Sequence, residues 1–186
     1  MAKKRGMSRR DFFRVSWLGS MGLALTGFAG ASLGFLWPSL RGGFGSTINL
    51  GDAAVLKEQI AAEPSGLLYF PGARSYLIAY DPTPGQEDVY GDLSKAGLLA
   101  VYQKCAHLGC RVPSCATSQW LECPCHGSRY NKAGEYQFGP APRGLDHFPL
   151  TMDGDAVKVD TSNRIVGPPR GVDTISQAPA GPHCVG

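Results

Sequence analysis

Five of the six cysteines and two of the four histidines lie between residues 105 and 130; Cys115 stands apart, and the other four cysteines group with the two histidines. They form two boxes, Cys-x-His-x-x-Cys at 105–110 and Cys-x-Cys-His-Gly-Ser at 123–128, with twelve residues between them. Thiolates and neutral imidazoles are both strong ligands of transition metals. Each box offers one cysteine and one histidine and has a second cysteine to spare. The pattern therefore predicts a metal centre with mixed sulfur and nitrogen ligands from two facing loops.

Three kinds of site compete for these residues. A zinc ion with two cysteine and two histidine ligands would be tetrahedral, but its usual spacing groups the cysteines apart from the histidines. A framework of disulfides is common in exported chains with six cysteines, but it would leave the histidines unexplained. The third kind is a [2Fe–2S] cluster with both cysteines on one iron and both histidines on the other.

The boxes at 105–110 and 123–130 resemble the cluster-binding boxes of Rieske iron–sulfur proteins, and Gly139-Pro140-Ala141-Pro142 resembles that family's Pro loop. The resemblance extends over roughly residues 1–170. It implies a Rieske-type [2Fe–2S] cluster and a specific set of ligands. The buried iron would be held by Cys105 and Cys123, the exposed iron by His107 and His126, and a disulfide would join Cys110 to Cys125.

Further residues around the cluster are implied by the same resemblance. Ser128 and Tyr130 match positions whose hydroxyl groups donate hydrogen bonds to a bridging sulfide and to a ligand cysteine, which favours the reduced state. The alternative is that Ser128 caps a turn and Tyr130 packs in the core. Leu108, Gly127 and Pro140 are expected to lie against the cluster.

The elements that must position these boxes are mostly short strands. Leu67–Phe70, Tyr76–Tyr80 and Leu98–Gln103 are apolar runs bounded by turn residues, and Asp153-Gly154 predicts a hairpin between 145–152 and 156–160. Asp52 is a candidate cap for a short helix that ends at Pro64. The predicted fold is mainly β, a Rieske-type antiparallel β base with an inserted cluster-binding lobe at about 105–143, plus one N-terminal transmembrane helix.

The N-terminal region predicts export and a membrane anchor. Residues 1–14 hold six basic residues and one acid, and Ser8–Phe13 resembles a twin-arginine motif, although a plain positive flank would look similar. Residues 15–37 carry no charge and would form a helix of about 35 Å, enough to span a bilayer. A cleavable signal is the alternative. The charge bias predicts a cytoplasmic N-terminus at the inner or plasma membrane and a head on the periplasmic side.

The remaining segments complete the predicted domains. Residues 38–46 are rich in glycine and predict a flexible hinge, with a passive linker as the alternative. The head spans 47–170 and a proline-rich tail spans 171–186. Cys115 and Cys184 are left over, and either form a second disulfide or remain two free thiols. His147 and His183 are expected to be ordinary turn or surface residues.

The function implied is that of a one-electron carrier. The net charge is +3, but residues 1–14 carry +5, so the rest of the chain carries −2 and is not expected to bind nucleic acid. The resemblance implies a redox subunit of a cytochrome bc- or bf-type complex in a respiratory or photosynthetic chain. Its partners would be a cytochrome b subunit, membrane quinol and a c-type cytochrome, with His107 or His126 accepting the quinol proton. The alternatives are the Rieske subunit of an exported molybdenum oxidase of the arsenite-oxidase kind, or a zinc- or disulfide-stabilised periplasmic binding module.

Overall fold

The computed structural model describes residues 7–36, 44–85 and 88–185. The chain divides into two units, Met1–Arg41 and Gly42–Gly186, which are described separately. Most of the predicted hinge, residues 38–43, lies outside the described residues, as does the beginning of the leader.

The first unit contains helix α1, Arg9–Leu36. By length and composition this helix is long and apolar enough to cross a membrane. It begins six residues before the uncharged stretch, because Ser8 and Asp11 form a reciprocal cap. The Ser8 Oγ accepts the backbone N–H of Asp11 at 3.2 Å and donates to the Asp11 carboxylate at 2.6 Å. The twin-arginine-like sequence therefore also carries the signal that starts a helix.

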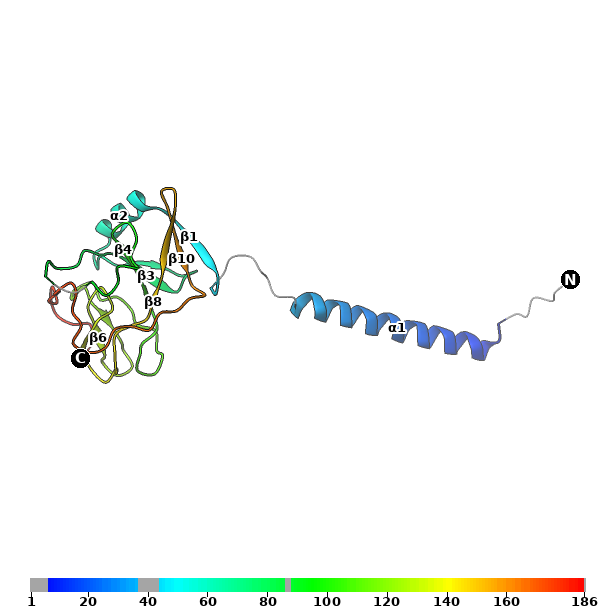
Figure 1. Ribbon diagram of the computed structural model, residues 1–186. Helices are drawn as coiled ribbons and strands as arrows, with labels where there is room; N and C mark the ends of the chain where they lie inside the picture. Colours follow the sequence, from blue (N-terminus) through cyan, green and yellow to red (C-terminus); the bar gives the residue numbers. More distant parts are fainter. Residues whose placement is uncertain (1–6, 37–43, 86–87, 186) are drawn as a thin grey trace. The chain divides into compact units, whose positions relative to one another are not determined.

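The base of the second unit, the head, is built from two antiparallel sheets (Figure 1). One has the strand order β1-β10-β9 and the other the order β2-β3-β4-β8. The mainly β, antiparallel prediction is thereby confirmed, and the three predicted strands correspond to β2, β3 and β4. The bounds are β1 Thr47–Asp52, β2 Leu68–Phe70, β3 Ser75–Ala79, β4 Leu98–Tyr102, β8 His147–Phe148, β9 Leu150–Asp153 and β10 Ala156–Asp160.

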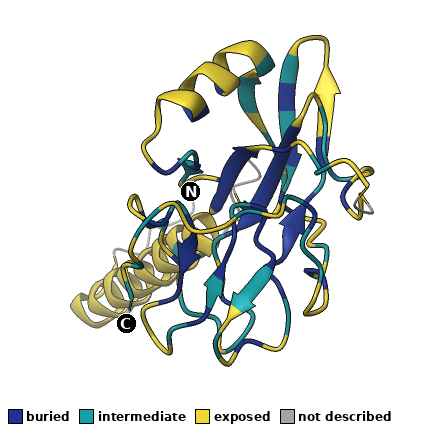
Figure 2. Cartoon of the chain, turned by 90° about the vertical axis from the view of Figure 1, so that its left-hand side faces the viewer, coloured by how far each residue is buried: buried dark blue, intermediate teal, exposed yellow. Residues whose placement is uncertain are grey.

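Helix α2, Ala53–Ala62, packs on this base with one face (Figure 2). Its buried face consists of Leu56 and Ile60, which join a core that also contains Phe148. The Asp52 carboxylate accepts the N–H groups of the first turn, as expected of an N-cap. The cap fixes the direction in which the chain leaves β1, so that α2 covers the apolar side of the sheet.

The lobe that contains both boxes is inserted between β4 and β8, which pair with each other in the base. It has its own sheet in the order β5-β6-β7, with the bounds Leu121–Glu122, Arg129–Tyr130 and Tyr136–Phe138. In Figure 1 the lobe, marked by β6, lies at the end of the head opposite α2. Leu121, Tyr130 and Leu145 pack in one core with Leu99 and Val101 of the base. The lobe and the base therefore share one hydrophobic core.

The expectation for His147 was wrong. This residue is only 1% exposed and lies in β8, opposite Val101 of β4. A histidine outside the two boxes was expected at a turn or at the surface, but the pairing of β8 with β4 turns the side chain into the core.

Candidate metal centre

The first box forms a tight loop directly after β4. The backbone N–H of Cys105 donates to the carbonyl of Cys110 at 2.8 Å, and that of Gly109 donates to the carbonyl of Cys105 at 3.0 Å. Gly109 has a φ of 79°, which glycine adopts at little cost. These bonds hold Cys105 at the base of the loop and leave His107 nearer its tip.

The second box forms a loop of the same design between β5 and β6. The N–H of Cys123 donates to Ser128 O at 2.8 Å, and the N–H of Gly127 donates to Cys123 O at 3.0 Å. Glu122 of β5 pairs with Arg129 of β6 and closes this loop. The two cysteines predicted to be ligands therefore stand at equivalent points of two similar loops.

A disulfide joins the two loops. Cys110 and Cys125 are bonded, with their Cα atoms 6.6 Å apart. The Cys123 Sγ lies within 4.8 Å of both sulfur atoms of this bridge. These are the two cysteines that the resemblance assigned to a disulfide.

The four candidate ligands come from the two loops that this bridge joins. Cys105 and Cys123 are buried free thiols, and burial raises the pKa of Cys123, with the neighbouring Cys105 thiol adding to the effect. The rings of His107 and His126 lie 4.9 Å apart. His126 is exposed, whereas the Nδ1 atom of His107 is buried and has no hydrogen-bond partner.

This arrangement fits a bound metal centre. A buried imidazole nitrogen without a partner is costly unless it binds something, and a metal ion would meet that need. A cation would also reverse the rise in thiol pKa, since it stabilises the thiolate. Zinc and a two-iron cluster both accept two sulfur and two nitrogen ligands, so the donor set alone does not choose between them.

Tyr130 touches the first candidate ligand from the core. Its side chain is fully buried, and its hydroxyl oxygen lies 3.2 Å from the Cys105 Sγ. Burial raises the pKa of Tyr130, with the Cys105 thiol as a further cause, so the phenol keeps its proton. It can therefore donate to Cys105 when that sulfur is a thiolate.

Ser128 links the second box to the Pro loop. Its hydroxyl oxygen accepts the backbone N–H of Ala141 at 3.1 Å, in a fully buried position. Accepting this bond leaves the hydroxyl hydrogen available for another acceptor. Ser128 therefore joins the second box to the Pro loop, and this role is compatible with donation to a cluster atom.

The Pro loop is held against the second box by a glycine. Gly139 has a φ of 99°, and a Cβ there would lie 2.6 Å from Ser128 Cα and 2.9 Å from Gly127 O. Only glycine permits this approach. Arg170 donates from Nε to the Ala141 carbonyl at 2.9 Å and holds the outer side of the loop.

The rim of the lobe is exposed. Leu108 is 71% exposed at the tip of the first loop, and Pro140 is exposed in the Pro loop. Gly127 is partly buried beneath the second loop. The three residues expected against a cluster therefore lie in the two box loops and the Pro loop, and Leu108 faces solvent.

Two supporting residues, Arg170 and Glu122, were not predicted from the sequence. Arg170 lies beyond the boxes in a segment without periodicity, so nothing marked it. Glu122 directly precedes Cys123 and is 1% exposed, and a lone acid in an apolar strand was the signal that could have revealed it. The two leftover cysteines, Cys115 and Cys184, form a second disulfide with their Cα atoms 5.8 Å apart.

Comparison with known proteins gives a consistent result. A family model described as the Rieske [2Fe-2S] domain matches residues 86–149. The cytochrome b6-f complex iron-sulfur subunit of Synechococcus sp. (strain JA-3-3Ab) is 36% identical over 156 residues, which cover 82% of this chain and 86% of the relative. The chloroplastic cytochrome b6-f complex iron-sulfur subunit of Volvox carteri is 37% identical over 155 residues, 80% of this chain and 71% of the relative.

A likeness to solved structures is also found. The cyanobacterial plasma membrane Rieske protein from Synechocystis PCC 6803 is 24% identical and aligns with a TM-score of 0.41. The alignment covers 61% of this chain and 98% of that structure.

Proposed function

The chain belongs to the Rieske [2Fe-2S] iron–sulfur proteins, and on that premise we propose that it oxidises membrane quinol and passes the electron to a c-type cytochrome. Membership implies a Rieske-type [2Fe–2S] cluster, and the curated relatives are iron–sulfur redox subunits of cytochrome b6-f complexes. The chain is accordingly the redox subunit of an oxidoreductase of this kind and not a complete enzyme. A cytochrome b subunit with the quinol site is the proposed partner.

We propose the cluster ligands that the family resemblance implies. Cys105 and Cys123, both buried, would hold one iron, and His107 and His126, towards the rim, would hold the other. When bound, such a cluster supplies one-electron chemistry at a potential within about −150 to +300 mV. The observation that supports the assignment is the buried, unpartnered Nδ1 of His107, whose ring contacts that of His126, in a lobe that also holds two buried free thiols.

The two imidazoles are proposed to handle the proton. The Nδ1 atom of His107 is enclosed, so Nε2 is the atom left to accept a hydrogen bond from a quinol hydroxyl and to hold its proton. His126 is exposed beside it and offers a second acceptor. Leu108 and Pro140 at the rim would exclude water around the quinol head group. Cys110–Cys125 keeps the two loops together throughout.

We propose that α1 anchors the chain in the inner or plasma membrane, with the basic leader in the cytoplasm and the head on the periplasmic side. The head would swing about the hinge between its two partners. At the head end of the hinge, Phe44 stacks on Tyr102 at 5.8 Å, and the N–H groups of Gly45 and Ser46 donate to Thr161 Oγ1. Residues 44–46, the described end of the predicted hinge, are therefore held by the head.

Metal analysis of the detergent-solubilised full chain, joined to a redox titration, tests the proposal. We expect equal amounts of iron and acid-labile sulfide and, after reduction, a rhombic electron paramagnetic resonance signal with a mean g below 2. The midpoint should fall by about 59 mV per pH unit where one proton accompanies the electron. His126→Ala should lose iron, and the buried non-ligand variant His147→Gln should keep it.

Two results would contradict the proposal. Zinc in place of iron would favour the non-redox module, and co-purification with a molybdenum subunit instead of a cytochrome b would favour the exported oxidase.

A further inference from the structure

A third loop, with the same backbone hydrogen-bond pattern as the two ligand loops, lies between the two boxes. The N–H of Cys115 donates to Trp120 O at 2.8 Å, and the N–H of Gln119 donates to Cys115 O at 2.9 Å. Gln119 has a φ of 58°, which corresponds to the positive φ of the glycines in the ligand loops. Cys115 therefore occupies the place that Cys105 and Cys123 occupy in theirs. Its sulfur is bonded to Cys184 instead of standing free.

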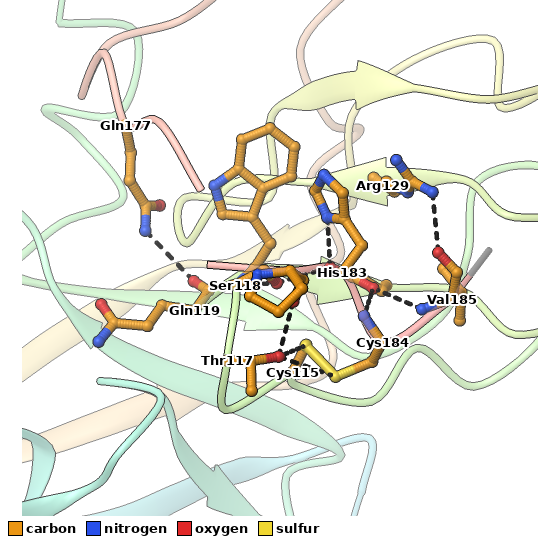
Figure 3. Close-up of polar contacts among 12 residues, drawn as sticks. Cys115, Thr117, Ser118, Gln119, Arg129, Gln177, His183, Cys184 and Val185 are labelled. Atoms are coloured by element: carbon orange, nitrogen blue, oxygen red, sulfur yellow. Dashed lines mark hydrogen bonds and ion pairs between the residues drawn. A yellow bond between two sulfur atoms is a disulfide. The ribbon is translucent and has the colours of Figure 1, made fainter. Parts of the chain in front are cut away.

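This disulfide brings a short tail segment, Pro182–Val185, against the lobe (Figure 3). We call this segment the strap. Thr117 Oγ1 donates to the Pro182 carbonyl at 2.7 Å, and the ring of His183 lies 5.3 Å from that of Trp120. The strap thus contacts the third loop at Cys115, Thr117 and Trp120.

The strap also satisfies the buried carboxylate of Glu122. That carboxylate accepts hydrogen bonds from His183 Nδ1 at 2.7 Å, Cys184 N at 2.7 Å and Val185 N at 2.9 Å. Its other donor is Ser118 Oγ at 2.5 Å. His183, expected to be an ordinary surface residue, therefore has a defined partner. Without the strap, the nearly fully buried Glu122 carboxylate would keep only the hydrogen bond from Ser118. Leaving a buried charged group with so few donors is energetically costly.

The last described residue of the strap reaches the opposite strand. Arg129 donates from its guanidinium to the carbonyl of Val185 at 2.8 Å. Glu122 and Arg129 are the pair that closes the second ligand loop. The strap therefore holds both stems of the loop that carries Cys123 and His126.

We propose that the strap, locked by Cys115–Cys184, positions the second ligand loop and thereby the geometry of the metal centre. The proposal rests on the proposed ligand role of that loop. Glu122, His183 and Cys184 are positioning residues, because they act through the stems and touch no ligand side chain in the described contacts. The competing account is a simple staple, since a bridge between residues 69 apart stabilises a fold by restraining the unfolded chain.

The test compares two variants of the full chain in detergent. Cys115→Ser combined with Cys184→Ser removes the lock. Glu122→Gln keeps the disulfide but turns an amide NH2 towards donors, so that strap N–H groups lose their acceptor. Asp52→Ala is the matched control, because it removes the N-cap of α2 in the base and leaves the lobe contacts unchanged.

Amide hydrogen exchange at residues 123–128 and the electron paramagnetic resonance line shape are the readouts. We expect exchange in this loop to rise about tenfold in both lobe variants, with a broadened or shifted signal and faster cluster loss. The control should change neither the loop exchange nor the signal. Unchanged exchange and line shape in both lobe variants would overturn the proposal and leave the staple.

The two proposals fail differently. A parent chain without iron would remove the proposed function, yet the exchange measurement would still decide whether the strap holds the loop. A parent chain with the cluster, and variants indistinguishable from it, would remove the strap proposal alone.

Discussion

His147 is expected to make the head less stable in mild acid. Its side chain is fully enclosed, and its Nε2 atom lies 2.8 Å from the carbonyl of Ala133, to which it must donate. The aromatic ring of Tyr90 lies 4.6 Å from the imidazole. Burial lowers the pKa of His147 from 6.5 to about 4, and the Ala133 carbonyl and the Asp146 carboxylate only partly oppose this. The folded state therefore holds a neutral imidazole at a pH where the unfolded chain binds a proton.

The direction and size of the effect follow from linkage. Because folding lowers the pKa of this base, its contribution to the free energy of unfolding is intact above pH 6.5 and is lost as the pH falls towards 4. Between these values the unfolded chain binds more protons than the folded chain, so stability rises with pH. With the two pKa values given, the loss between pH 8 and pH 5 is about 2 kcal/mol.

Urea unfolding of the full chain in detergent, followed by near-ultraviolet circular dichroism from pH 8 to pH 5, measures this loss. His147→Gln is the comparison, because its amide can still donate to Ala133 but does not titrate. Carboxylates titrate equally in both chains, so their effect cancels in the difference. The free energy of unfolding of the parent should fall about 2 kcal/mol more than that of the variant. Parallel curves for the two chains would refute the reasoning.

Two further predictions concern the base and the metal centre. Ala96 is an exposed residue with a strained φ of 54°. Ala96→Gly should therefore raise the free energy of unfolding by about 1 kcal/mol in the same urea assay. An unchanged or lower free energy of unfolding would count against the strain. Tyr130→Phe removes the hydroxyl that lies 3.2 Å from Cys105 Sγ. Because a hydrogen bond to the more negative sulfur of the reduced state is stronger by about 1 kcal/mol, the midpoint potential should fall by about 40 mV. An unchanged midpoint would show that the bond is not made in the loaded protein.

Much of the head could be predicted because its signals are local. The spacing within each box, the apolar runs before Cys105 and the acid at Asp52 all act on neighbours along the chain. The Cys115–Cys184 pair could be suggested only because these two cysteines are left over outside the boxes, since nothing local links residues 69 apart.

The rest depends on contacts between distant segments. Glu122 looks like an ordinary strand acid until the strap supplies its donors. His147 looks polar until the pairing of β8 with β4 encloses it. The strands β5 and β6 are two residues each, too short for any periodic pattern to mark them. Tertiary packing decides these positions, and a single sequence carries little trace of it.

The bare backbone at Gly139 has a consequence for how well the centre is sealed. Because a Cβ at this position would collide with Ser128 Cα and Gly127 O, any larger residue must lift the Pro loop off the second box. The gap would admit water to the sulfur side of the lobe and raise the local polarity around the ligand cysteines. Exclusion of water from the lobe thus depends on the absence of a side chain at Gly139.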